Sequence, residues 1–152
     1  MQQKEEYEKK FRQLRRNNET IKNLCSISGI AEIGAVKIYS KVIDGRRFAS
    51  KYKYWGYCGL VKHEKESGGR SYGKKKARYS RTLKSVYKTA AWAAIGGKND
   101  IREYYEYLLS HEHLEEKKAI NQIARYIAKS TLAIIKNKEG YKPYSWRKTK
   151  EG

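Results

Sequence analysis

The sequence predicts an all-α fold: a helical domain that contains a helix-hairpin-helix, with an N-terminal coiled-coil-like helix and a long basic, glycine-rich loop. Apolar residues recur at intervals of three and four along most of the chain, as they do on one face of a helix. Glycines separate these segments where helices would end. The 152 residues, 39% of them hydrophobic, suffice for one modest core. We therefore expect one compact domain with appendages.

The N-terminal residues 1–24 show a heptad pattern with one polar member. Such a pattern is typical of a coiled coil, in which a polar residue sets the register of the paired helices. We expect a helix here that either pairs with a second copy of the chain or docks on its own domain. The heptad positions are Tyr7, Phe11, Leu14, Asn18, Ile21 and Cys25.

The sequence of residues 21–43 predicts a helix-hairpin-helix. Gly29 and Gly34 would permit a tight turn between two helices, because glycine adopts backbone angles that other residues avoid. The backbone N–H groups of such a turn, with the N-terminus of the next helix, attract phosphate without regard to base sequence. A plain structural connection through glycine is the alternative.

We expect a main domain over residues 25–140, which contains several further helices and one long loop. A helix from Phe48 to Tyr57 would present Phe48, Tyr52, Trp55 and Cys58 to the core. A polar, exposed loop follows at 59–79, because its glycines do not suit a helix interior. A helical bundle over 80–137, with helices near 80–95, 100–109 and 114–136, precedes a basic tail at 141–152 that we expect to be irregular or disordered.

The chain is strongly basic. Its formal net charge of +19 arises from 35 Lys and Arg against 16 Asp and Glu, and residues 45–88 hold fourteen Lys and Arg but two Glu. This excess favours a polyanionic partner, above all nucleic acid. No apolar stretch is long enough to span a membrane, so we expect a soluble, intracellular protein. Cys25 and Cys58 lack a second Cys or His at metal-ligand spacing, which argues against a zinc site.

Ser67 is the loop residue that could carry chemistry. It lies in the run Glu66-Ser-Gly-Gly-Arg70, among many cations. Ser-Gly-Gly is usually a turn, and a serine hydroxyl is a weak nucleophile unless it is activated. Positioned Lys and Arg side chains would, however, stabilise the charge that develops on phosphoryl oxygens during attack on a phosphodiester. A nucleophilic serine is one interpretation and a simple turn is the other.

Five motifs occur in a fixed order. They are Ser26-Ile-Ser-Gly-Ile-Ala-Glu-Ile-Gly-Ala35, Asp44-Gly-Arg-Arg-Phe48, Tyr57-Cys-Gly-Leu-Val61, Glu66-Ser-Gly68 and Ser80-Arg-Thr-Leu-Lys84. Together they resemble the transposase domain of the IS-one-ten (IS116/IS902-type) insertion-sequence family over residues 21–141. The resemblance implies a DNA recombinase guided by a bridge RNA, in the cytoplasm of a prokaryotic cell at the nucleoid. It also implies that Ser67 is the catalytic nucleophile that becomes covalently linked to DNA.

The chain departs from the family pattern at several positions. The family's hairpin usually reads Pro-Gly-Ile-Gly, whereas Ser28-Gly-Ile-Ala31 stands here, which weakens the expected phosphate contact at Ala31. Lys84 replaces a family arginine, so we expect a phosphate contact without the bidentate fork. Family members also carry an acidic RuvC-like domain that binds divalent metal, and this chain would begin within the coiled coil that follows it. We expect no metal in this chain, and Mg²⁺ in that acidic domain.

The predicted function is that of the DNA-binding, serine-bearing half of a transposase, which exchanges DNA strands through a covalent phosphoserine link. Expected partners are DNA, guide RNA, the acidic domain and a second copy bound through the N-terminal helix. A non-catalytic DNA- or RNA-binding module is the alternative. Besides the catalytic Ser67, the predicted DNA-binding residues are Gly29, Ala31, Gly34, Gly68, Arg70, Lys74, Lys75, Lys76, Arg78, Arg81 and Lys84.

Overall fold

The computed structural model describes residues 2–61 and 79–147, except for the side chains of residues 2, 3 and 11–17. These residues form α-helices and one short 3-10 helix, with no strand among them, which confirms the predicted all-α class. The elements are α1 (Gln2–Cys25), α2 (Glu32–Val42), α3 (Lys51–Tyr57), α4 (Arg81–Ile95), α5 (Asp100–Ser110), α6 (Glu116–Asn137) and η2 (Ser145–Arg147).

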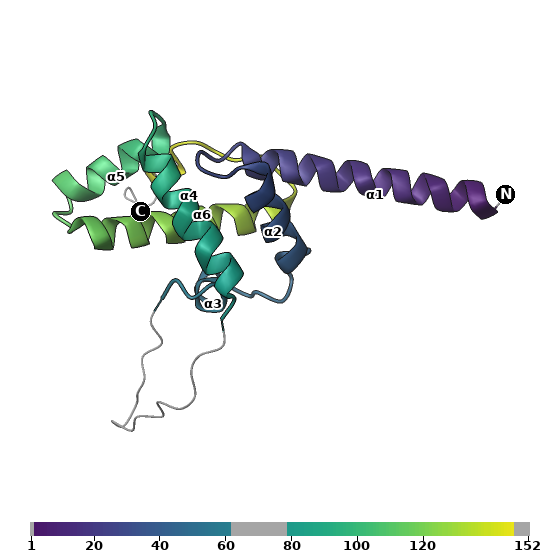
Figure 1. Ribbon diagram of the computed structural model, residues 1–152, viewed down its shortest axis with the longest axis horizontal. Helices are drawn as coiled ribbons and strands as arrows, with labels where there is room; N and C mark the ends of the chain where they lie inside the picture. Colours follow the sequence, from purple (N-terminus) through teal and green to yellow (C-terminus); the bar gives the residue numbers. More distant parts are fainter. Residues whose placement is uncertain (1, 62–78, 148–152) are drawn as a thin grey trace, which may run out of the picture.

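Helix α6 is the centre of the fold. It contacts each of the other five α-helices, and Ile123, Ile127 and Thr131 along it are fully buried. In Figure 1, α4 crosses α6 obliquely, and α5 lies beside the N-terminal part of α6. Ala91 and Ala94 on α4 are buried at this crossing side, and their small side chains let neighbouring elements approach closely.

Helix α1 is one continuous helix that projects from the rest of the molecule (Figure 1). Residues 4–10 are exposed, and Tyr7 keeps 78% of its surface accessible. At the other end Leu24 is fully buried, and Ile21 and Cys25 pack against the core. The C-terminal end of α1 therefore docks on its own domain, whereas pairing of its N-terminal part with a second copy stays a prediction.

The third helix starts later than its sequence predicted. It begins at Lys51 and not at Phe48, because Ser50 caps it by accepting a hydrogen bond from the Lys53 N–H at 3.3 Å. Helix α3 also buries a different face from the one that was predicted. Tyr52, expected in the core, is 64% exposed, and Tyr54 is fully buried in its place.

The C-terminal tail is irregular at residues 141–144, as predicted, whereas residues 145–147 form the 3-10 helix η2, and side-chain contacts hold the whole segment on the domain. The Tyr141 hydroxyl and the Tyr144 N–H both donate to the Asp100 carboxylate, at 2.5 and 3.0 Å. Trp146 in η2 is buried and stacks on Tyr104 with ring centroids 5.0 Å apart. Aromatic residues thus anchor the C-terminal segment on α5 despite its basic composition. Residues 148–152 of the predicted tail lie outside the described residues.

Candidate nucleic-acid interface

The predicted hairpin places Gly29, Ala31 and Gly34 at three different structural positions. Gly29 lies in the turn with a φ of +95°, which suits glycine, and the turn is closed by the Ile30 N–H donating to the Ile27 carbonyl at 3.1 Å. Ala31 is the N-cap of α2. Gly34 lies inside α2 and not in the turn, so the expectation that both glycines shape the turn is wrong for Gly34.

Gly29 is packed against α4. A Cβ atom at this position would lie 2.2 Å from the Ala90 carbonyl oxygen and 3.1 Å from the Ala94 backbone nitrogen. No side chain fits at such distances, so the absence of a side chain lets the hairpin touch the α4 backbone. The structure thus gives Gly29 a packing role that the sequence did not indicate.

The N-terminus of α2 has features that both favour and oppose phosphate binding. Ala31 provides no side-chain hydrogen bond to the first turn of α2, whose N–H groups have no acceptor within the helix. These N–H groups and the helix dipole attract anions. Glu32, however, places a carboxylate in the same turn and competes with phosphate for that field.

The segment 62–78 begins and ends at one place on the surface. The Ser80 N–H donates to the Tyr57 carbonyl at 2.7 Å, and a Cβ on Gly59, whose φ is +68°, would lie 2.5 Å from the Tyr79 ring. We call this junction of α3 and α4, formed by Tyr57, Gly59, Tyr79 and Ser80, the loop base. The predicted residues Ser67, Gly68, Arg70, Lys74, Lys75, Lys76 and Arg78 lie outside the described residues.

A buried polar chain fixes the helices beneath the loop base. The hydroxyls of Tyr54 on α3 and Tyr87 on α4 lie 2.5 Å apart. The Tyr87 hydroxyl lies 2.7 Å from Thr131 Oγ1 on α6, which donates to the Ala128 carbonyl at 2.8 Å. Burial raises the pKa of both tyrosines and raises that of the adjacent Cys58 thiol to about 12. All these groups are therefore neutral at physiological pH and hold α3, α4 and α6 together.

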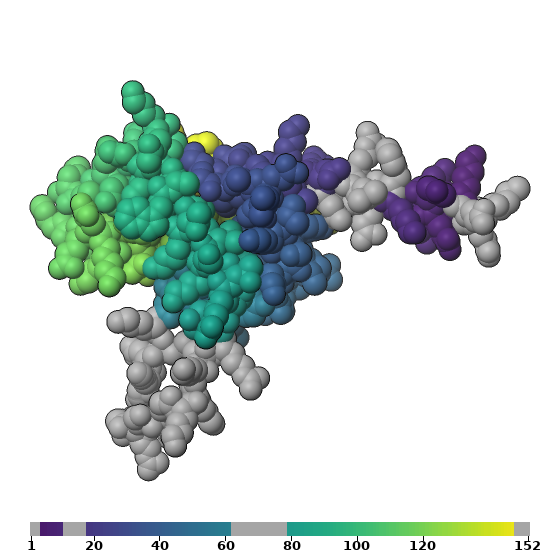
Figure 2. All heavy atoms as spheres, in the orientation of Figure 1, coloured from purple at the N-terminus to yellow at the C-terminus, as the bar shows by residue number. Residues whose placement is uncertain are grey.

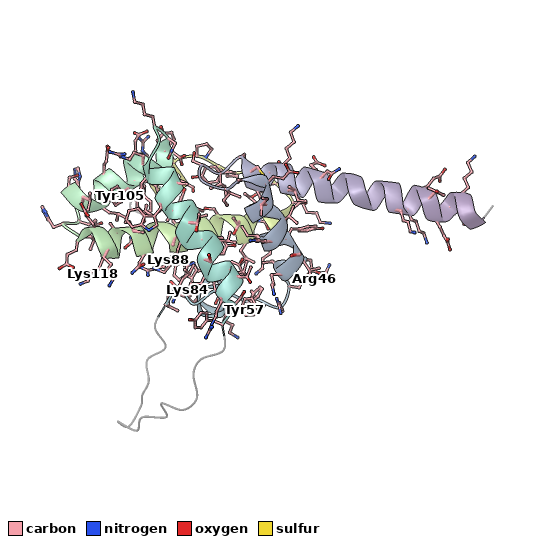
Figure 3. The ribbon with its side chains drawn as sticks, viewed as in Figure 1. Arg46, Tyr57, Lys84, Lys88, Tyr105 and Lys118 are labelled. Carbon is pink, nitrogen blue, oxygen red and sulfur yellow. The ribbon has the colours of Figure 1, made fainter. Side chains whose placement is uncertain are left out.

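Cationic side chains line the surface from the loop base along α4 and α6. On α6, Lys117, Arg125 and Lys129 are separated by eight and four residues, which places them on one face of the helix. Lys84 and Lys88, four residues apart, share a face of α4 for the same reason. Lys88 Nζ donates to Asn121 Oδ1 and so joins the two rows. Figure 3 labels Lys84 and Lys88, with Tyr57 nearby. We call Lys51, Lys84, Lys88, Lys117, Arg125 and Lys129 the cationic band.

The cationic band lacks internal charge compensation. None of its six side chains takes part in an ion pair with another described residue. Burial lowers the pKa of Lys88, and repulsion by Lys84, Arg125 and Lys117 lowers it further. Burial also lowers the pKa of Lys129, and Lys51 adds to the shift. A bound polyanion would relieve this repulsion.

Three aromatic rings lie within the cationic band. Lys84 Nζ is 5.1 Å from the centroid of the Tyr79 ring at the loop base. Lys51 Nζ is 5.2 Å from the Tyr52 centroid and 5.5 Å from that of Trp55. The Arg125 guanidinium is 5.9 Å from the Trp55 centroid, and the Trp55 indole N–H donates to the Arg125 carbonyl at 2.8 Å. Aromatic and cationic side chains thus alternate over the surface around the loop base.

The structure brings some predicted residues together and adds others. Lys84 belongs to the cationic band, and Arg81 is exposed at the first position of α4, beside the loop base. Lys88, Arg125 and Lys129 were not predicted. The spacing of Lys117, Arg125 and Lys129 by eight and four residues was visible in the sequence, but the packing of α6 under the loop base was not. On the face shown in Figure 2, α4 lies between the α5–α6 end of the molecule and α2.

The part of the chain that the structure describes offers no fitting set of metal ligands. No group of three or more His, Cys, Asp or Glu side chains in it could hold a metal ion. His111 and His113 lie beyond the end of α5, where His111 stacks on Tyr107 and its Nδ1 is 3.0 Å from the Ser110 hydroxyl. The family resemblance places Mg²⁺ in the acidic domain and not in this chain, and that expectation stays a prediction. Among the described helices, none has the length and apolar character required to cross a membrane.

Comparison with known proteins identifies a family. No curated protein and no solved structure matches the chain. A family profile described as "Transposase IS116/IS110/IS902 family" matches residues 21–106, more than half of the chain. The match extends from the docked end of α1 into α5 and includes the hairpin, the loop base and all of α4. This chain belongs to the IS116/IS110/IS902 transposase family.

Proposed function

We propose that this chain is the DNA-binding, serine-bearing half of a transposase, in which Ser67 attacks a DNA phosphodiester during strand exchange. Membership of a transposase family supports a role in DNA recombination. The observation that carries the proposal is the loop base: both ends of the segment that contains Ser67 meet there, beside uncompensated cations. A phosphate drawn to those cations would lie close to the segment.

Chain length limits how far Ser67 can be from these cations. Ser67 lies six positions after Val61, and an extended chain spans at most about 3.5 Å per residue, so Ser67 stays within about 20 Å of Val61. Lys84 and Arg81 follow within a few residues of the other end of the segment. Chain length therefore permits Ser67 to lie beside a phosphate bound by Lys84.

The proposed reaction is a pair of transesterifications. The Ser67 Oγ–P bond forms as one P–O bond of the DNA backbone breaks, and the released DNA hydroxyl keeps the proton that the serine loses. Lys84 and Arg81, with the predicted loop cations, stabilise the charge on the phosphoryl oxygens. A second DNA hydroxyl then attacks the phosphoserine, which joins the exchanged strand and restores the serine hydroxyl.

Three partners complete the proposal. The acidic, Mg²⁺-binding domain expected from the family resemblance would be a separate unit, since the described residues do not fit that metal. A guide RNA would select the DNA, and the complex would act at the nucleoid. The exposed N-terminal part of α1, with its heptad pattern, supports pairing with a second copy. The hairpin N–H groups near Gly29, Ala31 and Gly34 would add backbone contacts to DNA.

The test of this proposal is covalent capture of DNA. The chain is mixed with target DNA, the family's acidic domain and guide RNA, and a denaturing gel is used to look for a protein–DNA adduct. We expect an adduct with the native chain and with Ser71→Ala, a matched control in the same segment, but none with Ser67→Ala. An adduct that persists in Ser67→Ala would show that another residue is the nucleophile.

A second function is supported by the cationic band itself. The band needs no nucleophile to hold phosphates, so the chain could be a non-catalytic module that binds DNA or RNA. Tight DNA binding without an adduct, under conditions in which a complete family member reacts, would favour this function. Salt dependence would not separate the two functions because both neutralise phosphates.

A further inference from the structure

Three aromatic residues at the loop base and on the adjoining helix α3 keep part of their surface accessible. Tyr52 is 64% exposed and Tyr79 is 38% exposed, and Trp55 is half-buried. Burial of large rings is a main source of folding free energy, so the parts of these rings left at the surface contribute little to the fold. Each of these three rings lies next to a member of the cationic band.

Binding of a DNA duplex does not call for this arrangement. The bases of a duplex are stacked inside it, and a protein holds its backbone through cations and hydrogen-bond donors, the tyrosine hydroxyl among them, which leaves the ring faces without a partner. An unpaired strand instead exposes the flat faces of its bases, which stack on aromatic side chains, while its phosphates bind neighbouring cations. The alternation of rings and cations around the loop base suits an unpaired strand and not a duplex.

We propose that the loop base and the adjoining surface of α3 bind unpaired, single-stranded nucleic acid, with Tyr52, Trp55 and Tyr79 stacking on bases and the cationic band holding the phosphates. This inference rests on the proposed function and adds that the nucleic acid bound at this site is single-stranded. Strand exchange separates a strand from its complement, and such a strand must be held near the nucleophile while its backbone is broken.

The contacts around Trp55 give the strand a defined place. Tyr52 and Trp55 meet edge to face, with centroids 5.3 Å apart and ring planes at 85°, so the two rings offer faces in different directions. Trp55 is held by its hydrogen bond to the Arg125 carbonyl, and Arg125 in turn donates to the Leu60 carbonyl at 3.3 Å. A ring that is already fixed loses little entropy on binding.

A negatively charged protein surface is the main rival occupant, because it would also satisfy the cations. Such a surface has no need of exposed ring faces, and an acidic side chain cannot stack on them. A single strand brings one base and one phosphate in each repeat, and so matches both kinds of side chain. Binding of an acidic polypeptide is therefore measured in the test as well.

The test compares three DNA probes of equal length by fluorescence anisotropy at fixed salt: a single strand, an abasic single strand and a duplex. The abasic strand keeps the phosphates but has no bases to stack. We expect the native chain to bind the normal strand at least about fivefold more tightly than the abasic strand for each stacked base. Equal affinity for the two strands would overturn the proposal, and this comparison needs no variant.

Variants then locate the stacking. Tyr52→Ala with Tyr79→Ala should weaken binding of the normal strand at least about fivefold per ring and leave the abasic strand nearly unchanged. Tyr7→Ala, which removes a more exposed ring far along α1, is the matched control and should change neither affinity. Unchanged binding of the normal strand by the double variant would overturn the assignment. Binding of polyglutamate that depends on the same two tyrosines would also overturn it, in favour of an acidic protein.

A charge comparison tests the phosphate half of the proposal. Lys88→Gln with Arg125→Gln should weaken binding of normal and abasic strands alike and reduce the salt slope of both. Lys98→Gln with Lys138→Gln removes the same charge outside the cationic band and should have a smaller effect. Equal losses from the two pairs would show that net charge alone, and not the cationic band, attracts the strand.

The binding test and the adduct test can fail separately. All binding measurements are repeated in a Ser67→Ala background, where no covalent product can form through that residue. Tyrosine-dependent strand binding without a Ser67-dependent adduct would refute the proposed chemistry alone. A Ser67-dependent adduct with tyrosine-independent strand binding would refute this inference alone.

Discussion

Replacing Gly29 by alanine tests whether the hairpin glycine serves packing or phosphate binding. The added Cβ would lie 2.2 Å from the Ala90 carbonyl oxygen. The obstacle is backbone within α4, which cannot rotate away as a flexible side chain would. Gly29 also has a φ of +95°, a conformation that alanine rarely adopts. Gly29→Ala should therefore destabilise the fold itself.

The expected size of this effect follows from two costs. Placing a residue with a Cβ in the left-handed region costs about 1–2 kcal/mol, and forcing an extra carbon into a closely packed contact costs about 1–3 kcal/mol. Partial relaxation of the hairpin would offset some of this sum. We expect Gly29→Ala to lower the free energy of unfolding by about 2–4 kcal/mol.

Gly34→Ala is the matched control. Its Cβ would meet only Val86 Cγ1, at 3.5 Å, which is ordinary van der Waals contact. Because Gly34 lies inside α2, alanine should raise the free energy of unfolding by about 0.5–1 kcal/mol. Urea unfolding followed by circular dichroism measures both variants, and duplex DNA affinity is measured on the folded fraction of each.

The outcome decides between two roles for the hairpin. If Gly29→Ala unfolds at the same urea concentration as the native chain but binds DNA more weakly, the packing argument is wrong and backbone approach to phosphate explains the glycine. If Gly34→Ala is the more destabilised of the two, the assignment of the turn to Gly29 is wrong.

Two further predictions concern the buried polar chain beneath the loop base. Thr131→Val keeps the side-chain shape but removes the acceptor for the Tyr87 hydroxyl, so the free energy of unfolding should fall by about 1–3 kcal/mol in urea unfolding, and no loss would refute this role. The Cys58 thiol, with a pKa raised to about 12 by burial, stays protonated until the pH approaches that value. Near pH 8, Ellman's reagent should therefore react with Cys25 well before Cys58, with comparable rates only after unfolding; equal rates in the folded chain would contradict the burial of Cys58.

The long amphipathic helices were predictable from local pattern. Leu83, Tyr87 and Ala90 recur at the helical period, and the structure buries all three on α4. Ser80 was recognisable as a start, and its hydroxyl accepts from the Leu83 N–H at 3.1 Å. Where the spacing of apolar residues and the capping residue agree, these local signals are enough to predict both the helix and its buried face.

Short segments were harder because several registers fit the same residues. The seven residues of α3 contain four Tyr or Trp on different sides, and only the position of Tyr87 decides that Tyr54 and not Tyr52 is buried. The C-terminal segment posed a related problem. Its basic composition suggested disorder, but Trp146 finds its stacking partner Tyr104 more than forty residues away, a contact that no local pattern reveals.

The cationic band could not be predicted for the same reason. Lys88 and Arg125 lie far apart in the sequence and meet only because α4 and α6 cross. Composition indicated that a polyanion binds, and the basic segment at 45–88 indicated roughly where. Which cations face one another depends on helix packing, and the side chains from α6 were missed for that reason.

Helix α4 determines how far apart the proposed DNA contacts lie. Ser80 at its start closes the loop base, and Ala90 touches the hairpin ten residues later. At 1.5 Å per residue these points are about 15 Å apart along the helix axis, which equals about four to five base steps of DNA at 3.4 Å each. One short DNA segment could therefore meet the hairpin and the loop base together. Gly29 determines how the hairpin packs on α4, so a substitution there would disturb this spacing as well as the stability of the fold. Weaker DNA binding by such a variant would therefore not by itself identify a phosphate contact.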